Sequence, residues 1–162
     1  MSRPFLSSRP SRSSVRARLA AVAASLTLLA PGVALIGTPP AQATTLGQRA
    51  VAEAARHYQA PYRYGAAGPY RFDCSGLTLF VFARLGRSLP HSAAMQYNAR
   101  GVRHVSRAQL ALGDLVFTIR SGGIRHVGIY AGNNQMWAAT QTGDVVRKQS
   151  LANRILVFGR VS

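Results

Sequence analysis

The chain has 162 residues, of which 48% are hydrophobic, and its formal net charge is +16. This length suits one domain of ordinary size, and no internal repeat or low-complexity tract indicates more. The basic residues are scattered and do not cluster with aromatic side chains, so no nucleic-acid partner is expected. The single cysteine excludes an intramolecular disulfide.

The first 43 residues have the composition of a secretory signal peptide. Five arginines and no acidic residue precede an apolar run from Leu19 to Ile36, and Ala41-Gln42-Ala43 follows as a small-x-small cleavage site. A retained membrane anchor is the alternative, because the run is near the lower limit for a spanning helix. A proline and glycines break the run and favour cleavage. We therefore expect a secreted or cell-wall protein whose mature domain is 44–162, with no stable membrane span.

The expected mature domain is strongly basic. It retains fifteen basic residues and all four acidic ones, a net charge of +11. An exported protein with this charge meets anionic cell-wall polymers and phospholipid head groups first. We therefore expect the charge to hold the protein at anionic cell-wall polymers.

Helical patterns dominate the first half of this domain. Thr45 can cap a first helix, and Pro61 ends it. Residues 60–72 form a loop rich in Gly, Pro and Tyr. Asp73 can cap a second helix with a buried apolar face, which Gly86 stops. The expected helices are 46–58, 74–85 and 92–98, with a helical turn at 106–110.

After Gly113-Asp114 the pattern changes to short segments rich in β-forming residues. Gly132-Asn133-Asn134 suits a tight hairpin turn between two of them. Helices first and strands afterwards predict an α+β domain with an antiparallel sheet. The expected strands are 115–119, 126–131, 135–140, 145–149 and 155–161.

The only cysteine occupies a position that favours thiol chemistry. Cys74 follows the expected cap Asp73, so it lies in the first turn of a helix, where free N–H groups and the helix dipole favour a thiolate. The same N–H groups could stabilise an oxyanion, and Gly76 would let a substrate backbone come close. His126, at the head of a strand, could accept the thiol proton and return it to a leaving amine. The alternatives are a buried structural cysteine and a structural histidine.

The other three histidines, His57, His91 and His104, stand outside this pattern, and a structural role is their default interpretation. Four histidines without paired spacing and one cysteine do not make a metal ligand set. Gly122-Gly123 lies between two strand-like runs and lacks the frame of a phosphate-binding loop. We expect no metal and no cofactor.

Six motifs follow one another in a specific order. They are Tyr62-Arg63-Tyr64-Gly65, Asp73-Cys74-Ser75-Gly76-Leu77, Leu89-Pro90, Gly113-Asp114-Leu115-Val116-Phe117, His126-Val127-Gly128-Ile129-Tyr130 and Gly132-Asn133-Asn134-Gln135-Met136. This set resembles the NlpC/p-sixty family of bacterial cell-wall cysteine peptidases across nearly the whole mature chain. The resemblance implies a papain-like fold, with N-terminal helices, including the nucleophile helix, packed on a C-terminal antiparallel sheet. It also implies cleavage of peptidoglycan stem peptides, typically between D-glutamate and the diamino acid.

The resemblance assigns roles to individual residues. Cys74 matches the nucleophile and His126 the base. Tyr62 matches a tyrosine near the oxyanion site. Asp73 and Ser75 match polar groups that help to hold the substrate's amino terminus. The sequence therefore favours a secreted peptidoglycan endopeptidase.

The chain departs from the family pattern in two places. A third polar residue, commonly His, is expected twelve residues after the base, where this chain has Ala138, which cannot accept a hydrogen bond from the imidazole. Thr140, Gln141, a backbone carbonyl or water could replace it, or the pair could act alone at a lower rate. The domain could instead be an inactive wall-binding module, or a thiol acyltransferase or amidase on another substrate. The second departure is His91, where the family often has Arg.

Overall fold

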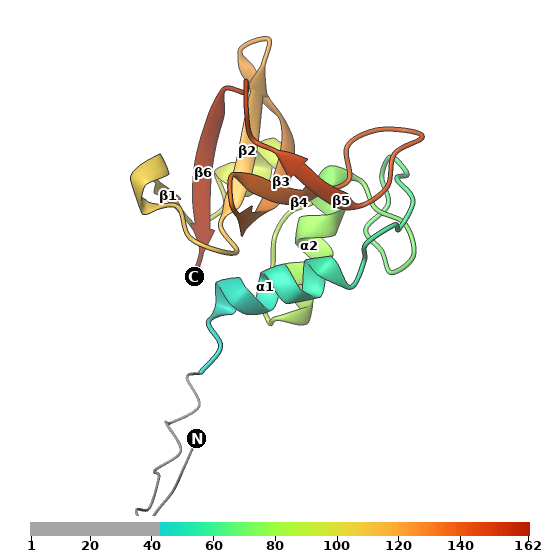
Figure 1. Ribbon diagram of the computed structural model, residues 1–162, viewed down its shortest axis with the longest axis horizontal. Helices are drawn as coiled ribbons and strands as arrows, with labels where there is room; N and C mark the ends of the chain where they lie inside the picture. The colour runs from blue at the N-terminus through green and yellow to red at the C-terminus, as the bar shows by residue number, and fades with distance from the viewer. Residues whose placement is uncertain (1–42) are drawn as a thin grey trace, which may run out of the picture. The chain divides into compact units, whose positions relative to one another are not determined.

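The computed structural model describes residues 43–162 (Figure 1). Of the expected signal peptide, residues 1–42 lie outside the described residues. Within them no helix is long and apolar enough to cross a membrane. The elements are α1 (Leu46–Ala55), α2 (Cys74–Arg84), α3 (Ala93–Tyr97), β1 (Val102–Val105), a 3-10 helix (Arg107–Gln109), β2 (Leu115–Arg120), β3 (Gly123–Gly132), β4 (Gln135–Ala138), β5 (Arg147–Ser150) and β6 (Leu156–Val161).

The strands form one antiparallel sheet in the order β1-β6-β2-β3-β4-β5. The helices α1 and α2 lie against one face of this sheet (Figure 1). Because alternate strand residues point to opposite faces, Leu115 and Phe117 join the core under the helices, while Val116 joins a smaller cluster on the other face. The expected α+β fold, with helices packed on an antiparallel sheet, is confirmed.

The helix α2 is the central element of the core and begins at the expected cap. Asp73 accepts a hydrogen bond from the Gly76 N–H at 2.7 Å. Leu77, Val81 and Phe82 are buried against the sheet, and full burial of such a side chain contributes about 1.5–3 kcal/mol. Capping and burial together hold the first turn of α2 in place relative to β3.

The observed elements differ from the expected ones mainly at their ends. The first helix stops at Ala55 and not at residue 58, because the chain turns and the Gln59 N–H bonds to the Val146 carbonyl of another segment. The strand expected to start at His126 starts at Gly123. The strand β1, which contains His104, was not expected; it has only four residues and no regular alternation of buried and exposed positions.

Tight turns join β2 to β3 and β3 to β4. Asn133 and Asn134 have φ angles of 50° and 56°, the left-handed region that a two-residue hairpin turn requires. The hairpin expected from Gly132-Asn133-Asn134 is therefore confirmed. Ser121 and Gly122 also have positive φ angles, so the chain reverses before β3 in the same way.

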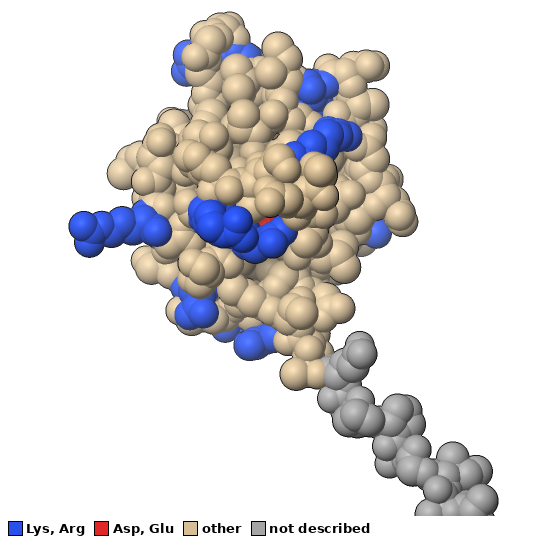
Figure 2. Space-filling view, turned by 90° about the vertical axis from the view of Figure 1, so that its left-hand side faces the viewer, with Lys and Arg blue, Asp and Glu red and all other residues tan. Residues whose placement is uncertain are grey.

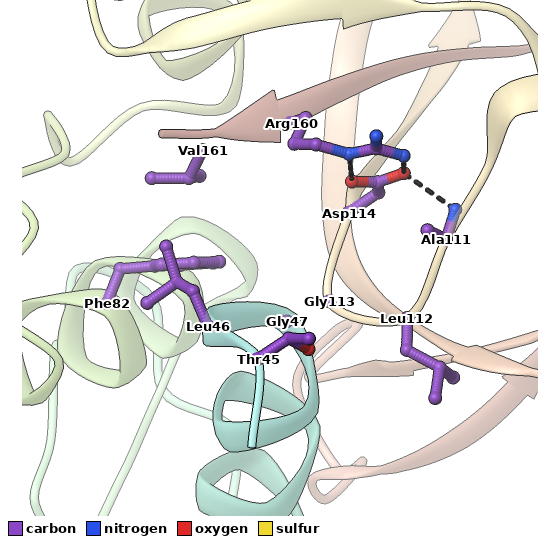
Figure 3. A pocket seen from close by; sticks show the side chains of 10 residues that line it. All are labelled: Thr45, Leu46, Gly47, Phe82, Ala111, Leu112, Gly113, Asp114, Arg160 and Val161. Carbon is purple, nitrogen blue, oxygen red and sulfur yellow. Dashed lines mark hydrogen bonds and ion pairs between the residues drawn. The ribbon is translucent and has the colours of Figure 1, made fainter. Parts of the chain in front are cut away.

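An ion pair ties β6 to the start of β2, beside the first turn of α1 (Figure 3). Arg160 donates to the buried Asp114 carboxylate through Nε at 2.7 Å and Nη2 at 2.8 Å, and the Ala111 N–H donates to it at 2.8 Å. The adjoining pocket has a volume of about 300 Å³ and is lined by neither cysteine nor histidine. We therefore assign this region a structural role, because its only charged groups neutralise each other.

Candidate active site

Cys74 lies at the first residue of α2, in a pocket of about 530 Å³. Five parts of the chain form its walls: the loop 60–72, the start of α2, the segment that leads into α3 with the first residues of α3, β3, and the segment after β4. The lining residues are Tyr62, Tyr64, Gly65, Asp73, Cys74, Ser75, His91, Ser92, Ala93, Ala94, Ile124, Arg125 and Thr140. The sequence motifs around Tyr62 and Cys74 therefore meet at one opening.

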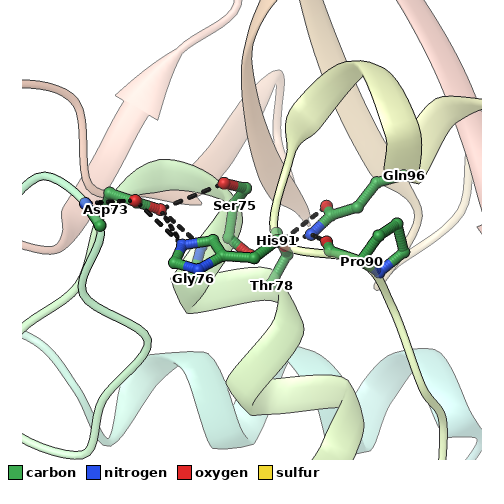
Figure 4. A network of polar contacts seen from close by, with 8 residues as sticks. Asp73, Ser75, Gly76, Thr78, Pro90, His91 and Gln96 are labelled. Atoms are coloured by element: carbon green, nitrogen blue, oxygen red, sulfur yellow. Dashed lines mark hydrogen bonds and ion pairs between the residues drawn. The ribbon is translucent and has the colours of Figure 1, made fainter.

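The Asp73 carboxylate organises one side of this pocket (Figure 4). Besides capping α2, it accepts hydrogen bonds from the Ser75 hydroxyl at 3.1 Å and the Gly65 N–H at 2.8 Å. His91 Nε2 lies 3.0 Å from both of its oxygens. Because it binds groups of the loop and of α2 together, Asp73 holds the loop 60–72 next to the start of α2 and Cys74.

His91 is a pocket residue that the default interpretation missed. It stands where the family often has Arg, and its contact with Asp73 places a side chain that can carry positive charge beside that carboxylate. The sequence signal was the Leu89-Pro90 motif directly before it. Neither His57 nor His104 lines the pocket of Cys74.

A buried glutamine, also missed by the sequence analysis, holds the opposite wall. Gln96 of α3 donates from Nε2 to the carbonyls of Ser75 at 2.9 Å and Pro90 at 2.8 Å (Figure 4). Its Oε1 accepts from the Thr78 hydroxyl at 2.7 Å. These bonds join the segment carrying His91 to the first turn of α2. No local motif marks a glutamine for this role, because its partners are distant in sequence.

Gly76 has a packing role and not the expected role of admitting substrate. A Cβ added to Gly76 would lie 2.1 Å from the Ala66 carbonyl oxygen. The loop therefore crosses directly over the helix at this point, and only glycine allows the contact.

The thiol of Cys74 is less acidic than the helix start suggested. Burial and the nearby Asp73 raise its pKa, while N–H groups of Val127, Ser75 and Cys74 itself act in the opposite direction. Burial wins because it removes water from the charged form. The resting side chain is thus a neutral thiol. The contact with the Val127 N–H also places the sulfur beside the residue that follows His126.

His126 lies in β3 opposite Thr118 and is buried. Burial, Arg154 and Arg120 lower the pKa of His126 to about 4, while Asp144 has a weaker opposite effect. The imidazole is therefore neutral at neutral pH, as a base must be. Within residues 43–162 its Nε2 is buried without a hydrogen-bond partner. Among the described residues, no hydrogen bond joins His126 to Cys74, and His126 does not line the pocket.

Ala138 stands near His126 on the neighbouring strand β4. Its Cβ lies 3.1 Å from where a Cβ of Gly128 would stand, so Ala138 faces Gly128, two residues along β3 from His126. His126 and Ala138 are thus diagonal neighbours on adjacent strands, and such residues share one face of a sheet and are within reach of each other when their side chains are long. Ala138 is fully buried among apolar residues, and it offers no acceptor to the imidazole.

Among the described residues, no hydrogen bond joins either expected substitute for Ala138 to the imidazole. The Thr140 hydroxyl interacts with Gln149 and with Asp144. Gln141 is exposed, and its backbone carbonyl accepts from the Asp144 N–H. Both residues therefore bind the segment around Asp144, although Thr140 also lines the pocket.

Tyr62 lines the same pocket as Cys74. Burial raises the pKa of Tyr62, and the nearby Cys74 and Asp73 raise it further. A phenol that keeps its proton can donate a hydrogen bond to an oxyanion. Tyr62, Asp73, Cys74 and Ser75 thus share one pocket, while His126 lies next to it in β3.

A cysteine at the start of a core helix, packed on an antiparallel sheet that carries a histidine, defines a papain-like α+β domain. Residues 59–157 match the NlpC/P60 family, and the chain belongs to this family. It is 42% identical over 114 residues to the probable endopeptidase p60 of Listeria monocytogenes, and the aligned region covers 68% of this chain and 23% of that protein. It is 34% identical over 116 residues to the bifunctional muramidase/DL-endopeptidase CwlT of Bacillus subtilis, covering 67% of this chain and 35% of that protein.

Solved structures agree with this family. The NlpC/p60 domain of the peptidoglycan hydrolase SagA superposes with a TM-score of 0.61 at 34% identity, covering 72% of this chain and 97% of that one. Rv1477, a hypothetical invasion protein of Mycobacterium tuberculosis, gives a TM-score of 0.63 at 30% identity, and the superposition covers 72% of this chain and 62% of that one. The chain spans about a quarter of the length of the p60 relatives.

Proposed function

We propose that this protein is a cysteine endopeptidase that cleaves amide bonds in peptidoglycan stem peptides. The observation that carries the proposal is Cys74 at the first turn of α2, in an open pocket that Tyr62, Asp73 and Ser75 also line. The names of similar proteins, which include endopeptidases and peptidoglycan hydrolases, support the same substrate class.

The geometry supports a mechanism that starts from two neutral groups. His126 takes the thiol proton as the Cys74 sulfur attacks the amide carbonyl carbon, and N–H groups at the helix start stabilise the oxyanion with Tyr62. The imidazolium then protonates the leaving amine, which leaves a thioester on Cys74. Water, deprotonated by His126, hydrolyses the thioester and frees the thiol. The imidazole has to come within hydrogen-bond distance of the sulfur, a contact that we expect substrate binding to complete.

Digestion of purified peptidoglycan tests this proposal. The purified wild-type chain and its Cys74→Ala variant are incubated with walls of the lysine and diaminopimelate types, and the released muropeptides are identified by mass. We expect fragments cut within the stem from the wild type and none from the variant. A folded wild-type protein that releases no fragment from either wall would refute the endopeptidase.

A wall-binding module is the second candidate, favoured by the unpartnered His126 Nε2 and by the surface charge. Figure 2 shows basic side chains projecting at separate places on one face, with little acidic surface between them. We propose export to the cell wall, where this charge would hold the protein at anionic polymers. Sedimentation with walls at rising salt tests it. Binding that salt weakens and that Cys74→Ala leaves intact, without any cleavage, would favour the module.

A further inference from the structure

A β-bulge places an arginine at the mouth of the candidate active site. In the β2–β3 pairing His126 stands opposite Thr118, but Ile124 stands opposite Ile119. Arg125, between these two β3 residues, therefore has no partner in β2. A bulge turns the extra side chain away from the regular alternation of the strand, and bulges are frequent beside active sites.

Arg125 is exposed and lines the pocket of Cys74. The only acidic residue in that lining is Asp73, which already contacts His91, the Ser75 hydroxyl and two backbone N–H groups. Within residues 43–162 no ion pair involves Arg125. One wall of the pocket thus carries an occupied carboxylate, and another carries a guanidinium available to a ligand.

A free carboxylate near the scissile bond is the ligand that this arrangement suits. When glutamate is linked through its side chain, its α-carboxylate stays ionised and is separated from the scissile carbonyl carbon by the α, β and γ carbons. Such a substrate, with its carbonyl at Cys74, carries a negative charge close to the pocket wall. Arginine binds carboxylates through parallel, charge-assisted hydrogen bonds.

We propose, building on the endopeptidase function above, that Arg125 binds the α-carboxylate of a γ-linked glutamate on the acyl side of the scissile bond. Arg125 is then a specificity residue: it favours stem peptides with a free carboxylate over those in which this group is a neutral carboxamide. It takes no part in proton transfer.

Two synthetic stem peptides that differ only at this group test the proposal. One carries γ-linked D-glutamate and the other its α-carboxamide, and kcat/KM is measured for wild type, Arg125→Gln and Arg103→Gln. Arg103 is an exposed arginine of β1, at the edge of the sheet away from β3, so its variant controls for lost charge alone.

We expect the wild type to prefer the acid peptide by about tenfold or more, as hydrogen bonds to charged groups allow. Arg125→Gln should lose that preference because its kcat/KM falls on the acid peptide only. Arg103→Gln should keep the preference. Equal losses on both peptides, or no loss, with a folded Arg125→Gln protein would overturn the proposal.

Binding without turnover separates this inference from the proposed function. The same peptides are titrated calorimetrically into Cys74→Ala and into Cys74→Ala with Arg125→Gln. Tighter binding of the acid peptide that disappears with Arg125→Gln supports the carboxylate site, even if the wild type cleaves neither peptide. Equal affinity of Cys74→Ala for the two peptides refutes it, even if both are cleaved.

Discussion

Restoring a hydrogen-bond acceptor at residue 138 should raise the turnover of this protein. Among residues 43–162 the buried Nε2 of His126 has no hydrogen-bond partner, and residue 138 lies on the neighbouring strand, diagonal to His126 across the β3–β4 pairing. An asparagine at 138 can direct its amide oxygen toward the imidazole and fix the tautomer that presents Nδ1 to the thiol. The variant that tests this prediction is therefore Ala138→Asn.

The magnitude follows from the state of the imidazole. A buried polar group left without a partner costs about 1–3 kcal/mol. If most of this free energy appears in the transition state, where the imidazole becomes charged, kcat rises between about fivefold and a hundredfold. Ala138 is fully buried, so the larger side chain also costs about 1–3 kcal/mol of stability through overpacking.

Steady-state cleavage of a stem peptide measures the effect, with thermal unfolding to verify the fold. Ala138→Leu is the matched control, because leucine has the same number of side-chain heavy atoms as asparagine, branched at the same carbon, and no acceptor. We expect a higher kcat for Ala138→Asn only. If the asparagine and leucine variants have the same kcat, and both are folded, then the missing acceptor at 138 does not limit the rate.

Three further predictions concern the base and the packing of the site. Burial and Arg154 hold the pKa of His126 at about 4, and only the neutral imidazole accepts a proton, so kcat/KM should fall only as the pH drops through about 4. Arg154→Gln should raise the pKa of His126 and move this acidic limb of the pH profile to higher pH. An unmoved acidic limb would contradict the assignment of His126 as the base. Gly76→Ala should lose about 3 kcal/mol of stability or fail to fold, because its Cβ meets the Ala66 carbonyl; a wild-type melting curve would argue against that contact. Gln96→Leu should lower stability by about 2–4 kcal/mol, because it removes the donor to two carbonyls and the acceptor of the Thr78 hydroxyl. Urea unfolding measures it, and a loss under 1 kcal/mol would show that water replaces these bonds.

Local interactions made much of the fold readable from the sequence. Asp73 caps α2 because its side chain bonds to the N–H three residues later, and the asparagines at 133 and 134 form a turn because they tolerate positive φ. Both effects depend on neighbours along the chain. The order of the motifs around Cys74 and His126 likewise indicated the family.

The strand β1 and the clamp formed by Gln96 were not predicted. The first is stabilised by pairing with β6, more than fifty residues later, and the second by carbonyls from two other segments. Neither leaves a periodic pattern in its own segment. The paired Asp73 and His91 also come together only because the chain folds back after α2.

The sequence by itself determined which reactive groups this protein has: one thiol, a histidine in a strand motif, and an alanine at position 138. The tertiary structure decided their chemical state. Burial makes Cys74 a weaker acid than its helix position predicts, and it leaves His126 neutral and without a partner at Nε2. A single-residue bulge turns Arg125 into the pocket. Desolvation and strand register arise from segments far apart in the chain, so no local pattern of residues records them.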